Sequence, residues 1–292
     1  MSVLQSIFLG FVQGVTEFLP VSSSGHLAII RNLFGIETDG GMFFDVLLHL
    51  GTMVAIFMVF RKDIVRMLLE SVHIVMDMIY NLKILVHNKK EQDAKRYKKI
   101  IHNNYRKFVV MILVSTVPTA IIGCTAQELV SIAGTTLMAP GVCLILNAGL
   151  LLVADVVESG KKIPKDVTFT NAFVVGIAQG LAVLPGLSRS GTTIAACLMN
   201  GFDRRFAVKY SFIMSIPAII GACILEFSQV TVQSIAFSQI AVYLIGAIVA
   251  GLVGYFCIRK MLVVVRKKQF KVFSLYCLLI GILAIAGHFL TK

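Results

Sequence analysis

Six long apolar segments constrain this chain more than any other feature, because each has nearly the length of a membrane-spanning helix. A bilayer core of about 30 Å needs roughly 20 apolar residues of helix. The chain is 57% hydrophobic and 14% charged, which leaves too little polar surface for a soluble protein of 292 residues. We therefore expect an all-α polytopic membrane protein with spans at residues 43–60, 108–124, 139–157, 206–226, 240–258 and 272–290.

Lysine and arginine residues gather between these segments in a pattern that orients the chain. Cytoplasmic loops carry an excess of both residue types. The same pattern accounts for the formal net charge of +12 without a nucleic-acid partner. We expect both termini outside, because the strongly basic regions are residues 61–66, 87–107, 161–165 and 259–271, whereas residues 125–138 and 227–239 contain no lysine or arginine.

Two stretches of the chain repeat one polar phrase in apolar surroundings. The first reads GFVQGVTEFLPVSSSGH from Gly10, and the second reads GIAQGLAVLPGLSRSGTT from Gly176. By the charge pattern, residues 2–34 must begin and end outside, and residues 167–200 must begin and end inside. We therefore expect two re-entrant helical hairpins, whose irregular turns at membrane depth need protein or a watery cavity around them.

Each hairpin is followed by three spanning segments, and the two sets are similar. FDVLLHLGTMVAIF from Phe44 can be aligned with FAVKYSFIMSIPAI from Phe206. Because three is an odd number, the second set is inverted relative to the first. We expect one membrane domain over residues 1–292, built as an inverted-topology repeat of residues 1–160 and 161–292, with the two hairpins meeting near the midplane.

Residues 61–107 lie outside this repeat plan. The stretch IVRMLLESVHIVMDMIYNLKILV from Ile64 places apolar residues three and four apart, with Glu70, Asp77 and Lys83 between them. This pattern predicts an amphipathic helix at the cytoplasmic interface, followed by a basic loop, and the alternative is a seventh span. We assign the basic loop no catalytic part.

Gln13 and Glu17 in the first hairpin stand four residues apart, so on a helix they share one face. A carboxylate inside an apolar segment costs roughly 3 kcal/mol on insertion scales. Glu17 should therefore face a polar cavity, a partner or an ion. The structural alternative is a carboxylate that caps the hairpin or pairs with an arginine.

A cluster of hydroxyls and an imidazole follows the first turn, at Ser22, Ser23, Ser24 and His26. At the start of a helix these groups can present backbone N–H groups, hydroxyl donors and an acid or base to one anion. The alternative is ordinary N-capping by one serine together with a buried histidine whose hydrogen bonds are satisfied.

The second hairpin places Arg189 between Ser188 and Ser190, with Thr193 one turn further on. The planar guanidinium group suits phosphate oxygens bound two at a time. The alternative is a structural ion pair between Arg189 and Glu17.

Taken together, the two hairpins predict one buried polar site to which each contributes half. Hydroxyls, helix N-termini and an arginine favour a phosphate, and the glutamate favours a divalent cation. A phosphate site inside a membrane points to a lipid phosphate or pyrophosphate. A transporter or lipid flippase is the rival class, because inverted repeats with broken hairpins are a transporter plan, but a carrier has no need of His26 beside Ser23.

The motifs of both hairpins resemble those of the bacterial undecaprenyl-pyrophosphate phosphatases, also known as bacitracin-resistance proteins. The family's first motif, Glu/Gln-x-x-x-Glu, matches Gln13 to Glu17, and its serine-rich stretch ending in Gly-His matches Ser22 to His26. Its second motif, Pro-Gly-x-Ser-Arg-Ser-x-x-Thr, matches the stretch from Pro185. The resemblance extends over essentially the whole chain.

This resemblance implies a multi-pass enzyme of the bacterial plasma membrane that hydrolyses undecaprenyl pyrophosphate to undecaprenyl phosphate and phosphate. Such an enzyme recycles the lipid carrier for peptidoglycan synthesis and confers bacitracin resistance. It implies dependence on Mg²⁺ or Ca²⁺, bound by Glu17 with Gln13. The expected partners are the polyprenyl pyrophosphate substrate and membrane lipids, with a lipid-flipping role and a homodimer left open.

The remaining site residues receive roles from the same resemblance. Arg189 would bind the pyrophosphate. Ser23 and His26 would attack the terminal phosphorus, and the nucleophile is left open between Ser23 activated by His26, His26 itself and a water molecule. The further substrate-binding candidates are the hydroxyl residues Ser22, Ser24, Ser188, Ser190 and Thr193.

Overall fold

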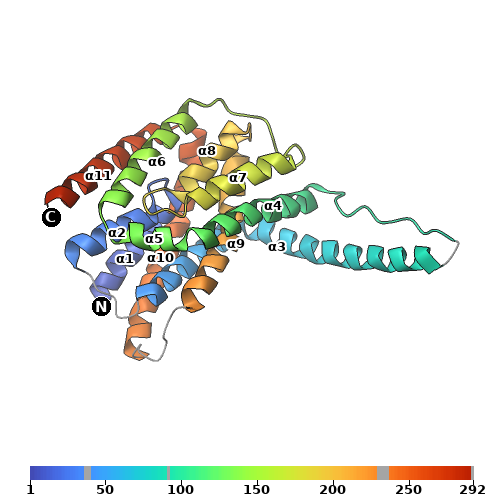
Figure 1. Ribbon diagram of the computed structural model, residues 1–292, viewed down its shortest axis with the longest axis horizontal. Helices are drawn as coiled ribbons and strands as arrows, with labels where there is room; N and C mark the ends of the chain where they lie inside the picture. The colour runs from blue at the N-terminus through green and yellow to red at the C-terminus, as the bar shows by residue number, and fades with distance from the viewer. Residues whose placement is uncertain (36–40, 91–92, 229–236, 291–292) are drawn as a thin grey trace.

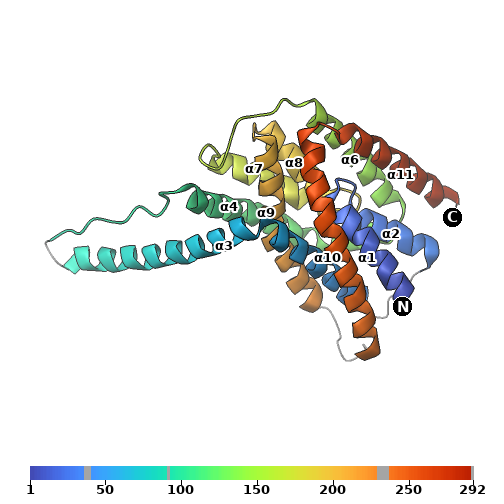
Figure 2. The same cartoon turned by 180° about the vertical axis from the view of Figure 1, so that it is seen from behind.

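The computed structural model describes residues 1–35, 41–90, 93–228 and 237–290, and these residues fold into helices, as the sequence predicts (Figures 1 and 2). The helices are α1 (Val3–Phe18), α2 (Ser23–Phe34), α3 (Gly41–Lys90), α4 (Asn104–Thr125), α5 (Gln127–Gly134), α6 (Met138–Val156), α7 (Phe169–Leu181), α8 (Arg189–Met199), α9 (Arg204–Ser228), α10 (Phe237–Arg266) and α11 (Phe270–Leu290).

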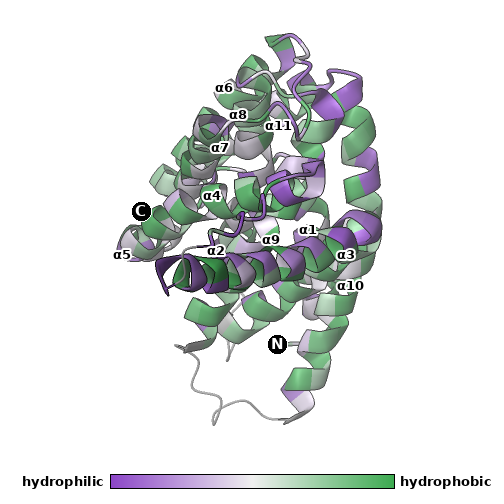
Figure 3. Cartoon of the chain, turned by 90° about the vertical axis from the view of Figure 1, so that its right-hand side faces the viewer, coloured by the Kyte–Doolittle hydropathy of each residue, from purple (hydrophilic) through white to green (hydrophobic). Residues whose placement is uncertain are grey.

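Six helices of the described chain are long and apolar enough to cross a membrane, which confirms the predicted number of spans. They are α3, α4, α6, α9, α10 and α11, and each contains one of the predicted segments, except that α6 ends one residue short of its segment. Hydrophobic residues predominate along these helices (Figure 3). Many of them are exposed, among them Leu252 and Phe256 on α10 and Leu279 and Leu283 on α11. Exposed side chains of this kind are suited to contact with lipid.

Four shorter helices form the two predicted hairpins. α1 and α2 have 16 and 12 residues, and α7 and α8 have 13 and 11. All four are shorter than the roughly 20 residues that a span requires. The helix–turn–helix form is therefore compatible with re-entrant hairpins, whose depth in the membrane stays a prediction.

The two hairpins match in their local signals as well as in their motifs. α1 and α7 each begin with a capping box, in which the side chains of the N-cap and N3 residues bond to each other's backbone. α2 and α8 each begin behind an N-cap serine, Ser22 or Ser188. α1 packs against α10 and α7 packs against α4, which is the exchange expected of an inverted repeat. The division into residues 1–160 and 161–292 stays a prediction.

Glycines allow both of these helix pairs to approach closely. A Cβ atom on Gly10 would overlap the carbonyl oxygen of Gly246 in α10, and one on Gly176 would overlap the carbonyl oxygen of Ser115 in α4. Gly14 and Gly180 repeat the contact one turn later. Small residues at i and i+4 are the usual device for tight helix packing inside membranes.

α3 is one helix of 50 residues that bends at Phe60, whose φ of −104° and ψ of 20° are not helical. Its second half, residues 61–90, leaves the helical body (Figures 1 and 2). The prediction of a helix here is confirmed, but the helix is continuous with the preceding span. The predicted external loop at 125–138 contains the short helix α5, and the loop at 227–239 lies mostly outside the described residues.

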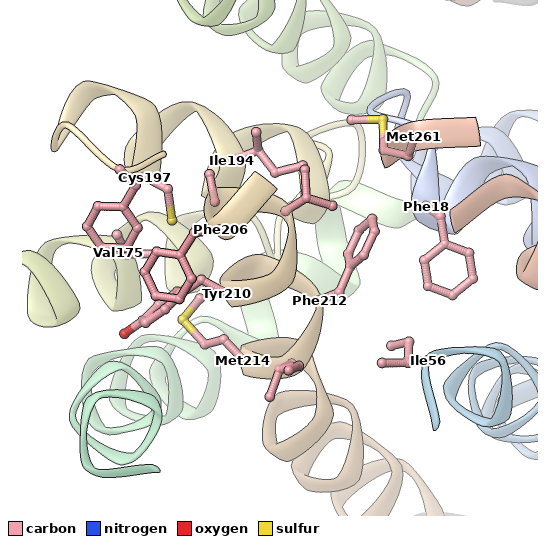
Figure 4. Close-up of a cluster of buried hydrophobic side chains, with 14 of the residues drawn as sticks. Phe18, Ile56, Val175, Ile194, Cys197, Phe206, Tyr210, Phe212, Met214 and Met261 are labelled. Atoms are coloured by element: carbon pink, nitrogen blue, oxygen red, sulfur yellow. The ribbon is translucent and has the colours of Figure 1, made fainter. Parts of the chain in front are cut away.

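The largest buried cluster joins the first hairpin to α9 (Figure 4). Phe18, at the end of α1, meets Phe212 edge to face with ring centroids 5.5 Å apart. Phe206 and Tyr210 continue the cluster along α9. Because Phe18 follows Glu17 in the chain, this packing fixes the end of α1 that carries the carboxylate.

We predict opposite effects for two glycine-to-alanine changes. Gly176→Ala should lower the melting temperature, because its methyl group overlaps α4 and overpacking costs about 1–3 kcal/mol. Gly149→Ala on α6 is the matched control, since nothing lies within 4 Å of its added Cβ and alanine favours a helix. Thermal unfolding in detergent, followed by size-exclusion chromatography, measures both. Equal melting temperatures would contradict the close-packing role.

Candidate functional site

The turns of the two hairpins are joined by one buried amide, that of Asn147 on α6. Its Nδ2 donates to the carbonyl oxygen of Pro20 in the first turn at 2.8 Å. Its Oδ1 accepts from the backbone N–H of Ser188 in the second turn at 3.2 Å. Asn147 is fully buried, so both bonds form in a setting of low dielectric constant.

Ser22 adds a second link between the turns and has an unusual backbone conformation. Its φ of 69° lies in the left-handed region, where residues other than glycine are rare. Its Oγ accepts from the N–H of Gly25, as an N-cap, and from the N–H of Gly186 in the other hairpin. The predicted substrate ligand Ser22 therefore serves the structure with both bonds.

Glu17 is the centre of a network that draws on both hairpins. Gln13 Nε2 donates to Glu17 Oε2 at 3.1 Å, which confirms that the two residues share a helix face. Ser23 Oγ donates to the same oxygen at 2.6 Å. Arg189 Nη2 forms an ion pair with the other oxygen, Oε1. The structure thus brings together Gln13, Glu17, Ser23 and Arg189.

Three predicted hydroxyl ligands of the second hairpin, Ser188, Ser190 and Thr193, are engaged within the protein. Ser188 Oγ caps α8 by accepting from the N–H of Gly191, and it lies 3.2 Å from Ser190 Oγ. Thr193 Oγ1 donates to the carbonyl oxygen of Arg189 at 2.7 Å and lies 2.6 Å from Ser211 Oγ. These bonds fix the first turn of α8, from which the Arg189 side chain extends.

His26 is buried and has partners other than Ser23. Its Nδ1 lies 2.8 Å from the carbonyl oxygen of Ser22, and because that oxygen can only accept, Nδ1 carries the proton. Its Nε2 lies 2.7 Å from the hydroxyl of Tyr276 on α11, and the two rings stack with planes 7° apart. The expected pairing of Ser23 with His26 is therefore not seen in this conformation.

Two residues that could supply oxygen ligands, Gln13 and Glu17, lie side by side on α1. Gln13 is fully buried, and its Oε1 has no hydrogen-bond partner. Mg²⁺ and Ca²⁺ take oxygen ligands, and Mg²⁺ is often held by one or two protein groups together with substrate phosphates. Among the described residues, no group of three or more His, Cys, Asp or Glu side chains is arranged to hold a metal. Glu17 and Gln13 would then be the protein ligands.

Two contacts of the site were not predicted. Asn147 could have been suspected as the one amide in the apolar stretch GVCLILNAGLLLV, because polar side chains inside a span are costly. Tyr276 carries no comparable signal, since tyrosine is common in apolar helices.

The predicted substrate ligand Ser24 is exposed and makes one long contact, 3.4 Å from Ser22 Oγ.

A partly buried glutamate–arginine pair with a serine hydroxyl, brought together by two hairpins among six apolar helices, defines a polytopic membrane protein with a polar cluster in its interior. Residues 6–283 match the family described as bacitracin resistance protein BacA, and the chain belongs to this family. It is a multi-pass bacterial membrane protein.

Relatives with assigned names are similar over nearly their whole length. A protein of Alkaliphilus metalliredigens named undecaprenyl-diphosphatase is 36% identical over 285 residues, with 98% of each chain covered. One of the same name from Methanosphaera stadtmanae is 37% identical over 286 residues, again with 98% of each chain covered. Undecaprenyl-diphosphatase 4 of Bacillus thuringiensis subsp. konkukian is 31% identical over 292 residues, covering 99% of this chain and 98% of its own.

We predict that Asn147→Leu destabilises the protein although it keeps the side-chain size. The change leaves the Pro20 carbonyl without its amide donor and the Ser188 N–H without an acceptor, at about 1–3 kcal/mol for each buried group. The melting temperature should fall by roughly 5 °C or more. Ser274→Ala is the control, because its hydroxyl also bonds across to α6, at Ala148, but touches neither turn. Equal melting temperatures for the two variants would show that the turns do not depend on the amide.

Proposed function

We propose that this chain hydrolyses undecaprenyl diphosphate to undecaprenyl phosphate and inorganic phosphate, the activity that the names of its relatives state. The observation that carries the proposal is the meeting of Glu17, Ser23 and Arg189 from two hairpins in one partly buried network. A carboxylate, a hydroxyl and a guanidinium group are the parts that phosphoryl transfer needs.

Arg189 is suited to bind the diphosphate. It is the first residue of α8, so its guanidinium group lies near the N–H groups at the start of that helix. Both features attract phosphate oxygens, and the planar guanidinium group binds two of them at once. In the conformation described here Glu17 takes the place of such an anion. Binding substrate would then exchange one negatively charged partner of Arg189 for another.

Glu17 and Gln13 are proposed to hold a divalent cation, Mg²⁺ or Ca²⁺. The carboxylate and the unpartnered Oε1 of Gln13 supply oxygen donors on one helix face. When bound, the cation would neutralise charge on the diphosphate oxygens and on the leaving group. The same face of α1 orients the carboxylate toward Ser23.

Ser23 is proposed as the nucleophile. Its Oγ would form a bond to the terminal phosphorus while the bond from that phosphorus to the bridging oxygen breaks, which releases undecaprenyl phosphate. The hydroxyl proton would pass to Glu17, whose Oε2 already accepts the Ser23 hydrogen bond. Water would then cleave the phosphoserine and release inorganic phosphate. Acid quenching and mass spectrometry would detect phosphate on Ser23, and its absence would favour water or His26.

His26 is proposed to act from beside the nucleophile. With Nδ1–H donated to Ser22, only Nε2 can exchange a proton, and Tyr276 now occupies it. Its bond to Ser22 also holds the start of α2, where Ser23 lies. A role in the second, hydrolytic step fits this placement. A lipid-flipping role and a homodimer stay predictions.

Release of phosphate from undecaprenyl diphosphate by the purified protein, with and without chelator, tests the activity. We predict that Glu17→Gln lowers turnover at least about 100-fold, about 2.7 kcal/mol of barrier. Gln13→Ala should lower it less, because an amide oxygen is the weaker ligand. Glu128→Gln on the exposed helix α5 is the control. Full turnover of Glu17→Gln, or of the unaltered protein in excess EDTA, would refute metal assistance.

We predict that Arg189→Lys folds normally but loses most activity, because lysine keeps the charge and lacks the paired N–H groups. Arg205→Lys, at an exposed arginine of α9, is the control. If Arg189 only neutralised Glu17, lysine would largely substitute for it. The double change Glu17→Gln with Arg189→Gln would then recover the melting temperature that either single change loses. Turnover and melting temperature are therefore measured together for Arg189→Lys, for Glu17→Gln and Arg189→Gln, and for the double change.

A further inference from the structure

The extension of α3, residues 61–90, carries an apolar face that no other described part of the chain covers. Its exposed residues recur every three or four positions, and each is 50% to 60% exposed: Val65, Leu68, Val72, Val75, Ile79, Leu82 and Val86. Leu69, Met76 and Met78 are also exposed and widen the face. An apolar surface of this length in water is an aggregation hazard, so it indicates a partner.

The opposite face of the extension is closed by the segment that returns to α4. Asn81 bonds to both backbone groups of Lys98, at 2.8 Å each. Asn88 does the same with Lys95, at 2.9 and 2.8 Å. These paired amide bonds hold an extended chain along the helix, so residues 61–90 and 93–103 form one two-layered unit. The apolar face is its outer layer.

The acidic residues of the extension are all engaged in pairs within the protein. Glu70 and Asp77 bind Arg106 at 2.8 and 2.7 Å, and Asp77 also meets Lys98 at 3.3 Å. Asp63 pairs with Lys209 on α9 at 2.9 Å. The negative charges of these three carboxylates are therefore neutralised by basic side chains of the same chain.

The charged side chains that remain exposed on the extension are basic. They are Arg61, Lys62, Arg66, Lys83, Lys89 and Lys90. The return segment adds exposed Lys95, Arg96 and Lys99 against the one acidic residue among its described positions, Asp93. The unit therefore combines an apolar face with exposed side chains whose net charge is positive.

We propose that this unit, residues 61–90 and 93–103, binds the anionic lipid surface of the inner leaflet with its apolar face inserted. The helix continues a membrane span without a linker, so its apolar face starts at the bilayer. Basic side chains near an anionic leaflet attract its headgroups, and apolar residues beside them enter the headgroup boundary. This proposal does not depend on the proposed phosphatase activity.

A second copy of the chain fits the same face less well. The three-and-four spacing also occurs in coiled coils, but Leu69, Met76 and Met78 make the face wider than the narrow seam that a coiled coil uses. Two copies would also bring basic side chains of the same sign together, whereas anionic headgroups complement them.

Electron paramagnetic resonance on the full chain tests the proposal. Single cysteines in a cysteine-free background carry spin labels at Leu68, Val75 and Leu82 on the apolar face, and at Arg96 and Lys99 on the return segment. Access to oxygen, which concentrates in lipid, is compared with access to a water-soluble nickel chelate. The protein is reconstituted in vesicles of phosphatidylcholine with 30 mol% phosphatidylglycerol, and in phosphatidylcholine alone.

In vesicles with phosphatidylglycerol, oxygen should reach the labels on the apolar face several-fold more readily than nickel does. Nickel should have the better access to the labels on the return segment. Charge reversal at Lys83, Lys89 and Lys90 should lower the ratio of oxygen access to nickel access at Val75 to the value measured in phosphatidylcholine alone. Reversal of Lys161 and Lys267, basic residues outside the unit, is the matched control and should change nothing. The melting temperature should be unchanged in both sets, which shows that the variants are folded.

Two results would overturn the proposal. Equal access of nickel to the apolar face and to the return segment in both lipids would place the face in water. Spin–spin broadening or disulfide cross-linking between copies at Val75→Cys, in vesicles that hold few copies of the protein, would assign the face to a second copy.

Discussion

The ion pair between Glu17 and Arg189 is the interaction on which the arrangement of the hairpins depends. Each charge lies on a short helix within an apolar body, and either one alone would be costly there. A buried ion pair is weak as a source of stability, because desolvation offsets much of the attraction, but loss of one partner is severe. The pair therefore lets two charged helices lie side by side in an apolar body, while the bonds of Asn147 and Ser22 join the turns and the packing of Phe18 and the glycine contacts supply stability.

Divergence between the two repeats is concentrated around this carboxylate. Ser23 is the first residue of α2 and Arg189 is the first residue of α8, so they occupy equivalent positions. Both reach Glu17, one at each carboxylate oxygen. The capping serines before them have kept one structural role in both copies. Glu17 and His26 differ as well, since Val183 and Thr192 stand at their places in the second hairpin, so the functional side chains have diverged while the capping serines have stayed the same.

Local patterns predicted most of the fold and half of the site. Apolar length gave the six spans, and the spacing of Gln13 and Glu17 placed both on one helix face. The repeat logic brought Arg189 to Glu17. Contacts between distant segments left no local trace, which is why Tyr276 was missed and why His26 was assigned to its neighbour Ser23. The continuity of α3 was also missed, although no glycine or proline separates the span from the stretch that follows it; the bend at Phe60 therefore left no mark in the sequence.

Asn147 belongs to neither hairpin, yet it binds the turns of both. It sits on α6, a helix that must match its apolar length to the thickness of the bilayer around it. A helix adapts to a thinner or thicker bilayer mainly by tilting. A tilt of α6 relative to the hairpins would move the Asn147 amide away from both turns at once, so the two turns depend together on the position of this one helix.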